Sequence, residues 1–322
     1  MNRMNRREFA ALAAATLLSP RAAGQAGAAA APRVTVQTDN PAAPGSPPRA
    51  AAPDVITRAI PRTGERLPVV GLGTASVFDS DDEQIRRSAA EIVKALIEAG
   101  GRLIDTASTY GDAEKVLGNV IAVGGVRDKV FVATKLEQPD TQELRRSMLR
   151  LRMLSFDLLQ LHNVHDAGQS LAQFKTWKEK GVCRYIGITS TYHSDFAAVE
   201  AVLQREKPDF VQIDYSLDNR EAEKRILPLA AEVKAGVLTA LPFGRGRLFR
   251  AVRDKPVPDW AKEFAQSWAQ FFLKYLLADE RITAVIPGTS NPAHMRENLG
   301  AMTGRLPDPG ERRKMETFAA SL

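Results

Sequence analysis

From residue 55 onward the chain alternates short apolar runs with segments of helical length, and this alternation constrains the fold more than any other feature. Eight such pairs follow one another between residues 69 and 301. The apolar runs are almost continuous, as expected for parallel strands buried on both faces. They cover residues 69–74, 102–106, 130–135, 156–161, 185–189, 210–214, 237–241 and 284–288. Eight strand–helix units over about 250 residues predict an α/β fold of the (β/α)8 TIM-barrel type.

Two further strands are expected before the first unit. Residues 56–61 and 65–70 flank Arg62-Thr63-Gly64 and predict a β-hairpin, which we expect to cap the bottom of the barrel. A doubly wound sheet is the alternative for such an alternation. However, residues 71–76 read Gly-Leu-Gly-Thr-Ala-Ser, so the third glycine of the Gly-x-Gly-x-x-Gly dinucleotide fingerprint is absent. The pattern therefore favours the barrel.

The first 31 residues have the layout of an export signal. Arg6-Arg7 precedes the apolar residues 10–18, and small residues that suit a cleavage site follow around 26–31. This layout predicts a twin-arginine (Tat) signal peptide, with the twin-arginine export machinery as a partner and a periplasmic or otherwise exported location. If the arginine pair is instead a chance feature of an Ala-rich tail, the protein stays in the cytoplasm.

The remainder divides into a linker and one domain. Residues 32–53 are rich in Pro and Ala and predict a flexible linker, which leaves 54–322 as the barrel domain. Beyond the leader, no stretch is long and apolar enough for a spanning helix, so no stable membrane span is expected in the mature form.

The net charge does not indicate a nucleic-acid partner. Of the formal +6, the leader accounts for +3, because it carries four arginines against Glu8. The other +3 is spread over 291 residues with no basic run interleaved with aromatic residues, so nucleic-acid binding is not expected. The single cysteine, Cys183, excludes a disulfide or a cysteine-based metal site within one chain, and we expect a packed thiol.

Polar residues stand at the ends of three successive apolar runs. Asp105 and Lys135 close the second and third runs, His162 directly follows the fourth, and Tyr110 lies five residues after Asp105. In a barrel the C-terminal ends of the strands face one mouth, where active sites lie. Adjacent strands are about 4.8 Å apart, so the Asp105 carboxylate is within reach of the Lys135 ammonium. We therefore expect the four side chains to share a pocket.

Together these four groups have the chemistry to deliver a proton to a carbonyl oxygen. A phenol has a pKa of about 10, and an ammonium about 4 Å away favours the phenolate by at most about 4 kcal/mol. Lys135 is thus expected to lower the pKa of Tyr110, the predicted proton donor, while Asp105 holds Lys135 and His162 orients the substrate oxygen. Each residue alone also has an ordinary structural explanation. Their joint order at neighbouring strand ends favours a catalytic set.

These motifs resemble the aldo-keto reductase superfamily across residues 55–302. The resemblance is carried by VGLGT at 70–74, IDTA at 104–107 with Tyr110-Gly111, Lys135, and LHN at 161–163. It implies an NAD(P)H-dependent oxidoreductase that reversibly reduces an aldehyde or ketone to an alcohol, with Tyr110 as the proton donor. The implied partner is a small carbonyl or alcohol substrate, and the favoured cofactor is NADP(H), with NAD(H) left open.

The same resemblance implies a cofactor site. It assigns the carboxamide contacts to Ser190 and Gln212, the pyrophosphate clasp to Gly244, Arg245 and Gly246, and the adenine end to Gly288, Thr289, Glu297 and Asn298. Two departures stand out. The family usually stacks an aromatic ring on the nicotinamide where this chain has Leu241-Pro242-Phe243, and NADPH-selective members carry a lysine and an arginine in the segment that here includes Gly288 and His294.

Two competing functions stay open at this point. The first is a non-catalytic, nucleotide-sensing or regulatory member of the same fold. The second is a metal-dependent hydrolase, suggested by His162 and His165, although an early His-x-His pair is missing and no metal is expected. The connection from Asn163 to Ser170 is short, which predicts an open mouth for large or varied substrates.

Overall fold

The computed structural model describes residues 54–322, so the predicted signal peptide (1–31) and linker (32–53) lie outside the described residues. Eight parallel strands form one sheet whose spatial order follows the sequence. They are β3 (Leu72–Gly73), β4 (Leu103–Asp105), β5 (Phe131–Leu136), β6 (Phe156–Leu161), β7 (Cys183–Ser190), β8 (Phe210–Asp214), β9 (Gly236–Ala240) and β10 (Ile282–Val285). Each strand pairs with its predecessor in the chain, as βαβ units require.

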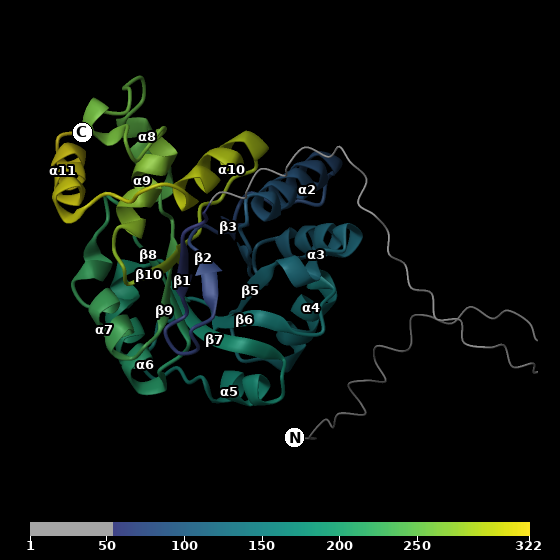
Figure 1. Ribbon diagram of the computed structural model, residues 1–322. Coiled ribbons are helices and arrows are strands. Elements are labelled where there is room, and N and C mark those ends of the chain that lie inside the picture. Colours follow the sequence, from purple (N-terminus) through teal and green to yellow (C-terminus); the bar gives the residue numbers. More distant parts are fainter. Residues whose placement is uncertain (1–53) are drawn as a thin grey trace, which may run out of the picture. The chain divides into compact units, whose positions relative to one another are not determined.

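The first and last strands also meet. Parallel bridges join Val70 to Val285 and Gly73 to Gly288, and the Gly71 N–H donates to the Val285 carbonyl at 2.8 Å across this seam. The sheet therefore curls into a ring, which confirms the predicted (β/α)8 architecture (Figure 1).

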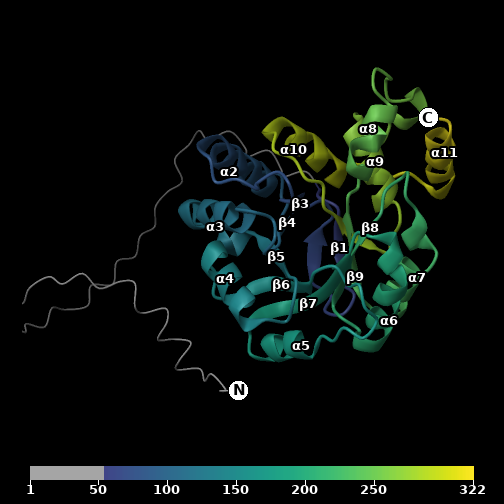
Figure 2. The same cartoon turned by 180° about the vertical axis from the view of Figure 1, so that it is seen from behind.

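Helices follow the strands and surround the sheet, as two opposite views show (Figures 1 and 2). One helix follows each strand in the predicted order: α2 (Glu83–Glu98), α3 (Ala113–Gly124), α4 (Thr141–Leu151), α5 (Ala172–Glu179), α6 (Phe196–Glu206), α7 (Ile226–Glu232), α9 (Trp268–Leu277) and α10 (Pro292–Leu299). Two more helices, α8 (Arg247–Ala251) and α11 (Pro309–Ala320), lie in the β9–α9 connection and at the C-terminus. Helix α10 packs against α2, which closes the outer ring as β10 closes the inner one.

Helix α2 illustrates why these segments are helical. Asp82 caps its N-terminus by accepting a hydrogen bond from the Ile85 N–H at 2.8 Å. Ile92 and Leu96, four residues apart, are fully buried on the face toward the barrel. The helix ends where Gly100 takes a left-handed conformation (φ +85°), as the paired glycines predict.

Two helices begin later than their apolar patterns suggest. The segment 221–234 starts with a short 3-10 turn, and α7 begins only at Ile226, after Arg225 with a φ of −136°. Pro228 explains the break, because proline lacks an N–H and is tolerated only in the first helical turn. The segment 264–277 becomes helical at Trp268, where Ser267 caps α9 by accepting from the Gln270 N–H at 3.3 Å.

The N-terminal hairpin covers the end of the barrel at which the strands begin, as predicted. It consists of β1 (Thr57–Ala59) and β2 (Arg66–Pro68). Arg62 in its turn donates to the carbonyls of Lys207 and Val233, which precede β8 and β9, at 3.0 and 3.1 Å. Ile60 and Leu67 are fully buried. They pack with inward-facing residues of the strands: Leu103, Phe131, Ala133, Leu158, Tyr185, Phe210, Leu238, Ala284 and Ile286.

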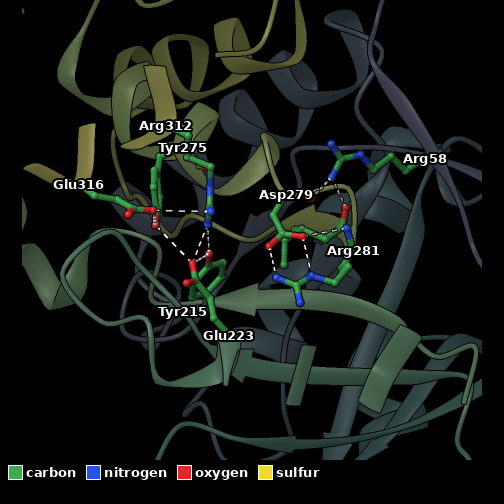
Figure 3. A network of polar contacts seen from close by, with 9 residues as sticks. Arg58, Tyr215, Glu223, Tyr275, Asp279, Arg281, Arg312 and Glu316 are labelled. Carbon is green, nitrogen blue, oxygen red and sulfur yellow. Dashed lines mark hydrogen bonds and ion pairs between the residues drawn. The ribbon is translucent and has the colours of Figure 1, made fainter. Parts of the chain in front are cut away.

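The C-terminal helix is tied to the loop that follows β8 (Figure 3). Arg312 of α11 donates to the Tyr215 hydroxyl at 2.5 Å and to Glu223 Oε1 at 2.6 Å. Its guanidinium also lies 4.4 Å from the centre of the Tyr275 ring, and the Tyr275 hydroxyl donates to Glu316 at 2.9 Å. These contacts join α11, α9 and the chain just beyond β8.

Cys183 is buried and unpaired, as predicted, and burial raises the pKa of its thiol to about 12. Within residues 54–322, no helix has both the length and the apolar character needed to cross a membrane.

Candidate active site

An ion pair buried at the C-terminal ends of the strands forms the centre of the site. Lys135 Nζ lies 2.6 Å from Asp105 Oδ2, and the ammonium also donates to the Thr106 carbonyl at 2.7 Å. Lys135 is only 1% exposed. Burial alone would lower the pKa of Lys135, but the Asp105 carboxylate and Tyr110 raise it above its ordinary value, so the lysine stays charged.

Two buried glutamines support the Asp105 carboxylate. Gln212 donates to Asp105 Oδ2 at 3.1 Å, and Gln160 contacts Asp105 Oδ1 at 3.4 Å and donates to Gln212 Oε1 at 3.0 Å. Gln212 was expected near the cofactor, whereas the sequence analysis missed Gln160. The spacing of the strand would have indicated it, because Gln160 stands two residues before His162 and alternate residues of a strand face the same side.

Tyr110 lies on the loop between β4 and α3, beside Lys135 and His162. The Lys135 ammonium is 4.9 Å from the centre of the Tyr110 ring, and the Tyr110 and His162 rings meet edge to face with centroids 5.7 Å apart. Lys135 acts in the predicted direction, because its ammonium favours the phenolate, but the pKa of Tyr110 still lies above its ordinary value. Burial raises the pKa of Tyr110; the ammonium opposes this increase and the Asp105 carboxylate adds to it. Tyr110 is therefore a neutral phenol that still holds its proton.

His162 follows β6 and contacts a second residue that the sequence analysis missed. Its Nδ1 atom faces the carboxylate of Glu137, which lies two residues beyond Lys135. The Thr109 hydroxyl donates to the same carboxylate at 3.3 Å. Burial, together with the charges of Lys135 and His165, lowers the pKa of His162 to about 3.

These groups open onto a cavity of about 430 Å³ at the mouth of the barrel. All four predicted catalytic residues, Asp105, Tyr110, Lys135 and His162, line it. Four of the residues predicted for the cofactor line it as well: Gln212, Arg245, Gly246 and Gly288. The structure thus brings together eight of the thirteen predicted site residues on one cavity wall.

A left-handed loop after β9 forms one side of the cavity. Gly244, Arg245 and Gly246 have φ values of +57°, +53° and +79°. A Cβ atom on Gly244 would lie 2.5 Å from the Asp218 carboxylate, so only glycine fits there. Arg245 is exposed and lines the cavity. Consecutive left-handed residues and an exposed cation suit the binding of an anion.

Five predicted cofactor residues do not line the cavity: Ser190, Gly244, Thr289, Glu297 and Asn298. Ser190 is fully buried, and its hydroxyl donates to Asp195 at 2.9 Å. Its neighbour Thr189 lines the cavity in its place. Thr289 accepts a hydrogen bond from the Asn291 N–H at 3.1 Å, directly before α10.

The residue that directly follows β9 is not aromatic, unlike the one that the resemblance implies. Ala240 ends the strand, and Leu241 follows it in a left-handed conformation with a φ of +54°. Leu241 and Phe243 both lie on the cavity wall. A left-handed leucine is strained, and such strain is concentrated at functional sites.

The two histidines that suggested a metal site contact different partners. His162 Nδ1 contacts Glu137, whereas His165 Nδ1 lies 2.7 Å from Asp195 Oδ2 on the surface. Among residues 54–322, no group of three or more His, Cys, Asp or Glu side chains is arranged to hold a metal ion.

Comparison with known proteins identifies the family. The family model described as "Aldo/keto reductase family" matches residues 69–310, which span the barrel and the cavity. The chain belongs to the aldo/keto reductase family. An aldo-keto reductase of Mycolicibacterium smegmatis is 32% identical over 250 residues, covering 72% of this chain and 81% of that protein. Methylglyoxal reductase YeaE of Escherichia coli is 27% identical over 252 residues, covering 74% and 87%.

Solved structures of aldo-keto reductases share the fold. One, from Klebsiella pneumoniae in complex with NADPH, matches with a TM-score of 0.66 and 22% identity over 79% of this chain and 92% of that one. The glycerol dehydrogenase of Gluconobacter oxydans matches with a TM-score of 0.69 and 22% identity, over 82% and 95%.

Proposed function

We propose that this aldo/keto reductase reduces an aldehyde or ketone to an alcohol with NADPH, in a reversible reaction. The observation that carries the proposal is the buried Asp105–Lys135 pair beside a neutral Tyr110 on the wall of an open cavity. A charged pair costs several kcal/mol to bury, so its place under a cavity favours a chemical role. Family membership supports the same conclusion.

The chain's own residues would move and hold one proton. The Tyr110 phenol donates to the substrate oxygen, because it retains its proton at neutral pH. Lys135 lies next to the ring and stabilises the phenolate that is left. Asp105, held by Gln160 and Gln212, keeps Lys135 in place. The bound nicotinamide supplies the hydride.

The cavity wall and the start of α10 beside it offer groups that suit the parts of a dinucleotide. Gln212 offers an amide at the inner end, and the loop 244–246 offers an exposed arginine in a glycine-lined turn at the outer end. Thr289 and the N-terminus of α10, with Arg296 on that helix, are the groups that we assign to the adenosine end. NADP(H) is the proposed cofactor because Arg296 provides a cation for the 2′-phosphate, and NAD(H) is the alternative.

Titration with NADPH and NADH tests this assignment. Replacing Arg296 with alanine is expected to weaken NADPH binding about tenfold and to leave NADH binding within about twofold, since one charge-assisted contact is worth roughly 1.5 kcal/mol. Equal losses for both nucleotides would contradict the proposed 2′-phosphate contact. Arg313, which lies on α11 and not on α10, provides the matched control.

The proposed activity is tested by following NADPH absorbance against a panel of aldehydes and ketones. The connection between β6 and α5 is short, which supports an open mouth, so the panel includes bulky ketones as well as small dicarbonyls such as methylglyoxal, the substrate in the name of the Escherichia coli relative. Tight nucleotide binding without any turnover would instead favour a regulatory member of the family.

We also propose that the protein is exported through the twin-arginine route, on the basis of Arg6-Arg7 and the apolar residues that follow. This route carries folded proteins, so the enzyme would leave the cytoplasm with its nucleotide bound. Fractionation of cells that express the full chain, with an Arg6→Lys/Arg7→Lys control, tests the location. Nucleotide released from the purified exported protein by denaturation tests the second part, and recovery of nucleotide-free protein would contradict it.

A further inference from the structure

Glu137 and His162 lie side by side at the edge of the cavity. Glu137 directly follows β5 and His162 directly follows β6, and the pairing of Leu136 with Leu161 brings the two residues side by side. The His162 N–H donates to the Leu136 carbonyl at 2.8 Å, which fixes the backbone on both sides. The Glu137 carboxylate then meets the ring at Nδ1. His162 lines the cavity, whereas Glu137 does not.

The contact at Nδ1 determines what the other ring nitrogen can do. A neutral imidazole carries one proton, so an ionised Glu137 holds that proton on Nδ1 and leaves Nε2 as an acceptor only. A carbonyl oxygen has no proton to give, and therefore cannot hydrogen-bond to such a nitrogen. An alcohol can, because its hydroxyl donates. One additional proton on the pair, on either the carboxyl or the ring, places a hydrogen on Nε2.

The surroundings favour a shared proton over two independent ionisations. Lys135 and Tyr110 face His162 from the cavity side, Asp105 lies behind Lys135, and His165 follows on the same loop. Glu143 of α4 faces Glu137 from the other side and accepts a hydrogen bond from its N–H at 3.0 Å. Burial lowers the pKa of His162, while burial and the Glu143 charge raise the pKa of Glu137. Both pKa shifts disfavour the ion pair of a Glu137 carboxylate and a His162 imidazolium.

We propose that Glu137 is a positioning residue that sets the tautomer of His162, so that one proton on the Glu137–His162 pair switches Nε2 from accepting an alcohol hydroxyl to donating to a carbonyl oxygen. This proposal rests on the proposed carbonyl reduction. Reduction requires the protonated pair and therefore declines as pH rises through the ionisation of the pair. Oxidation of the alcohol uses the deprotonated pair and rises over the same range. Tyr110, whose pKa is raised, loses its proton at higher pH and gives a separate step.

Glu137→Gln is the decisive variant, because glutamine keeps the hydrogen bond to Nδ1 in either direction but carries no charge. In the wild type, kcat/KM for reduction is expected to fall about tenfold per pH unit above the pKa of the pair. In Glu137→Gln it should vary less than about twofold across that window and fall only at the Tyr110 step. The proposal would be overturned if the pH profile of kcat/KM in the wild type showed only the step assigned to Tyr110. It would also be overturned if the step assigned to the Glu137–His162 pair were unchanged in Glu137→Gln.

Glu143→Gln is the matched control. It removes a neighbouring carboxylate that does not touch His162, so the step should move to lower pH by a fraction of a unit and persist. A structural role for Glu137 alone would lower the rate equally at all pH values. Loss of the step in both variants would count against the specific pairing.

A second measurement does not depend on turnover. The chain has only four histidines, so the ring nitrogens of His162 can be assigned in ¹⁵N NMR spectra by comparison with His162→Gln. At high pH the wild type should show a proton on Nδ1 and a free lone pair on Nε2, and Glu137→Gln should shift the tautomer toward Nε2–H. A wild-type ring with its proton on Nε2 at high pH would overturn the inference. If the tautomer is as expected but no carbonyl is reduced, it is the proposed function that fails.

Discussion

The two ends of the barrel are built from the same strands but filled in opposite ways. Toward the bottom, the inward-facing residues of β4, β5, β6 and β8 are Leu103, Phe131 with Ala133, Leu158 and Phe210. Two residues further along these strands stand Asp105, Lys135, Gln160 and Gln212. The lining of the barrel interior thus changes from apolar side chains to hydrogen-bonded charged and polar side chains over about 7 Å, the length of two strand residues.

This contrast separates the source of stability from the source of reactivity. The bottom is closed by the hairpin, with Ile60 and Leu67 fully buried, and contributes through apolar burial. The top holds a charged pair that is tolerated because every member has a partner. Substitutions at the bottom should therefore change unfolding alone, whereas substitutions at the top should change turnover, and also unfolding where they leave a buried charge unpaired.

Tyr110→Phe should have the largest effect on turnover and should separate turnover from stability most clearly. Removal of the phenol hydroxyl takes away the proton donor while the ring still packs against His162. We expect kcat/KM to fall by about 10²–10⁴-fold, with NADPH affinity nearly unchanged and the unfolding midpoint close to that of the wild type. Steady-state kinetics and nucleotide titration provide the measurements. Retained turnover would show that Tyr110 is not the acid.

Lys135→Met should affect turnover and stability together. The variant leaves Asp105 buried without its cation, which is expected to cost about 3–5 kcal/mol of unfolding free energy. The double variant Asp105→Asn/Lys135→Met should recover much of that loss, because no unpaired charge remains. Urea denaturation of both variants measures the coupling. Additive effects of the two substitutions would argue against the pair as a unit.

Leu67→Ala at the bottom should be the converse case. A fully buried leucine replaced by alanine usually costs about 2–5 kcal/mol, and kcat/KM of the folded fraction should not change. Leu149, which is 74% exposed on α4, is the control, and its replacement by alanine should change stability by no more than about 0.5 kcal/mol. A large loss of activity in folded Leu67→Ala would break the division between the two ends.

Two glycines with positive φ angles allow a comparison in which the expected effects are smaller. Gly64 in the hairpin turn has a φ of +76° with open space around it, whereas a Cβ on Gly244 would meet the Asp218 carboxylate. That carboxylate is held by Ser216 and Arg247 at 2.6 and 2.9 Å and does not move freely. Alanine at either position costs about 1 kcal/mol of backbone strain, but only Gly244→Ala should also weaken NADPH binding. Fluorescence titration of both variants with NADPH distinguishes the effect of backbone strain from the effect of displacing the loop 244–246.

Much of this arrangement is readable in the sequence, because buried parallel strands are apolar runs and polar residues at their ends stand out. Asp105, Lys135 and His162 were found in this way. Gln160 and Glu137 do not stand out in this way, because neither closes an apolar run. The two-residue period of a strand would reveal them, since it places Gln160 on the side of His162 and Glu137 on the side of Lys135.

The pKa of Tyr110 was misjudged for a different reason. Its burial depends on residues far away in the chain, and desolvation outweighs the single charge that the sequence suggested. The exclusion of a side chain at Gly244 likewise depends on Asp218, a neighbour that sequence spacing does not reveal.

The seam that closes the barrel has a consequence for synthesis of the protein. Gly73, on the cavity wall, pairs with Gly288, and Val70 pairs with Val285, so residues more than 200 positions apart complete one wall. A nascent chain that has not yet passed residue 288 has two open sheet edges and no complete pocket. The proposed catalysis therefore requires that residue 288 has left the ribosome, and the appearance of activity in a translation reaction reports the arrival of β10.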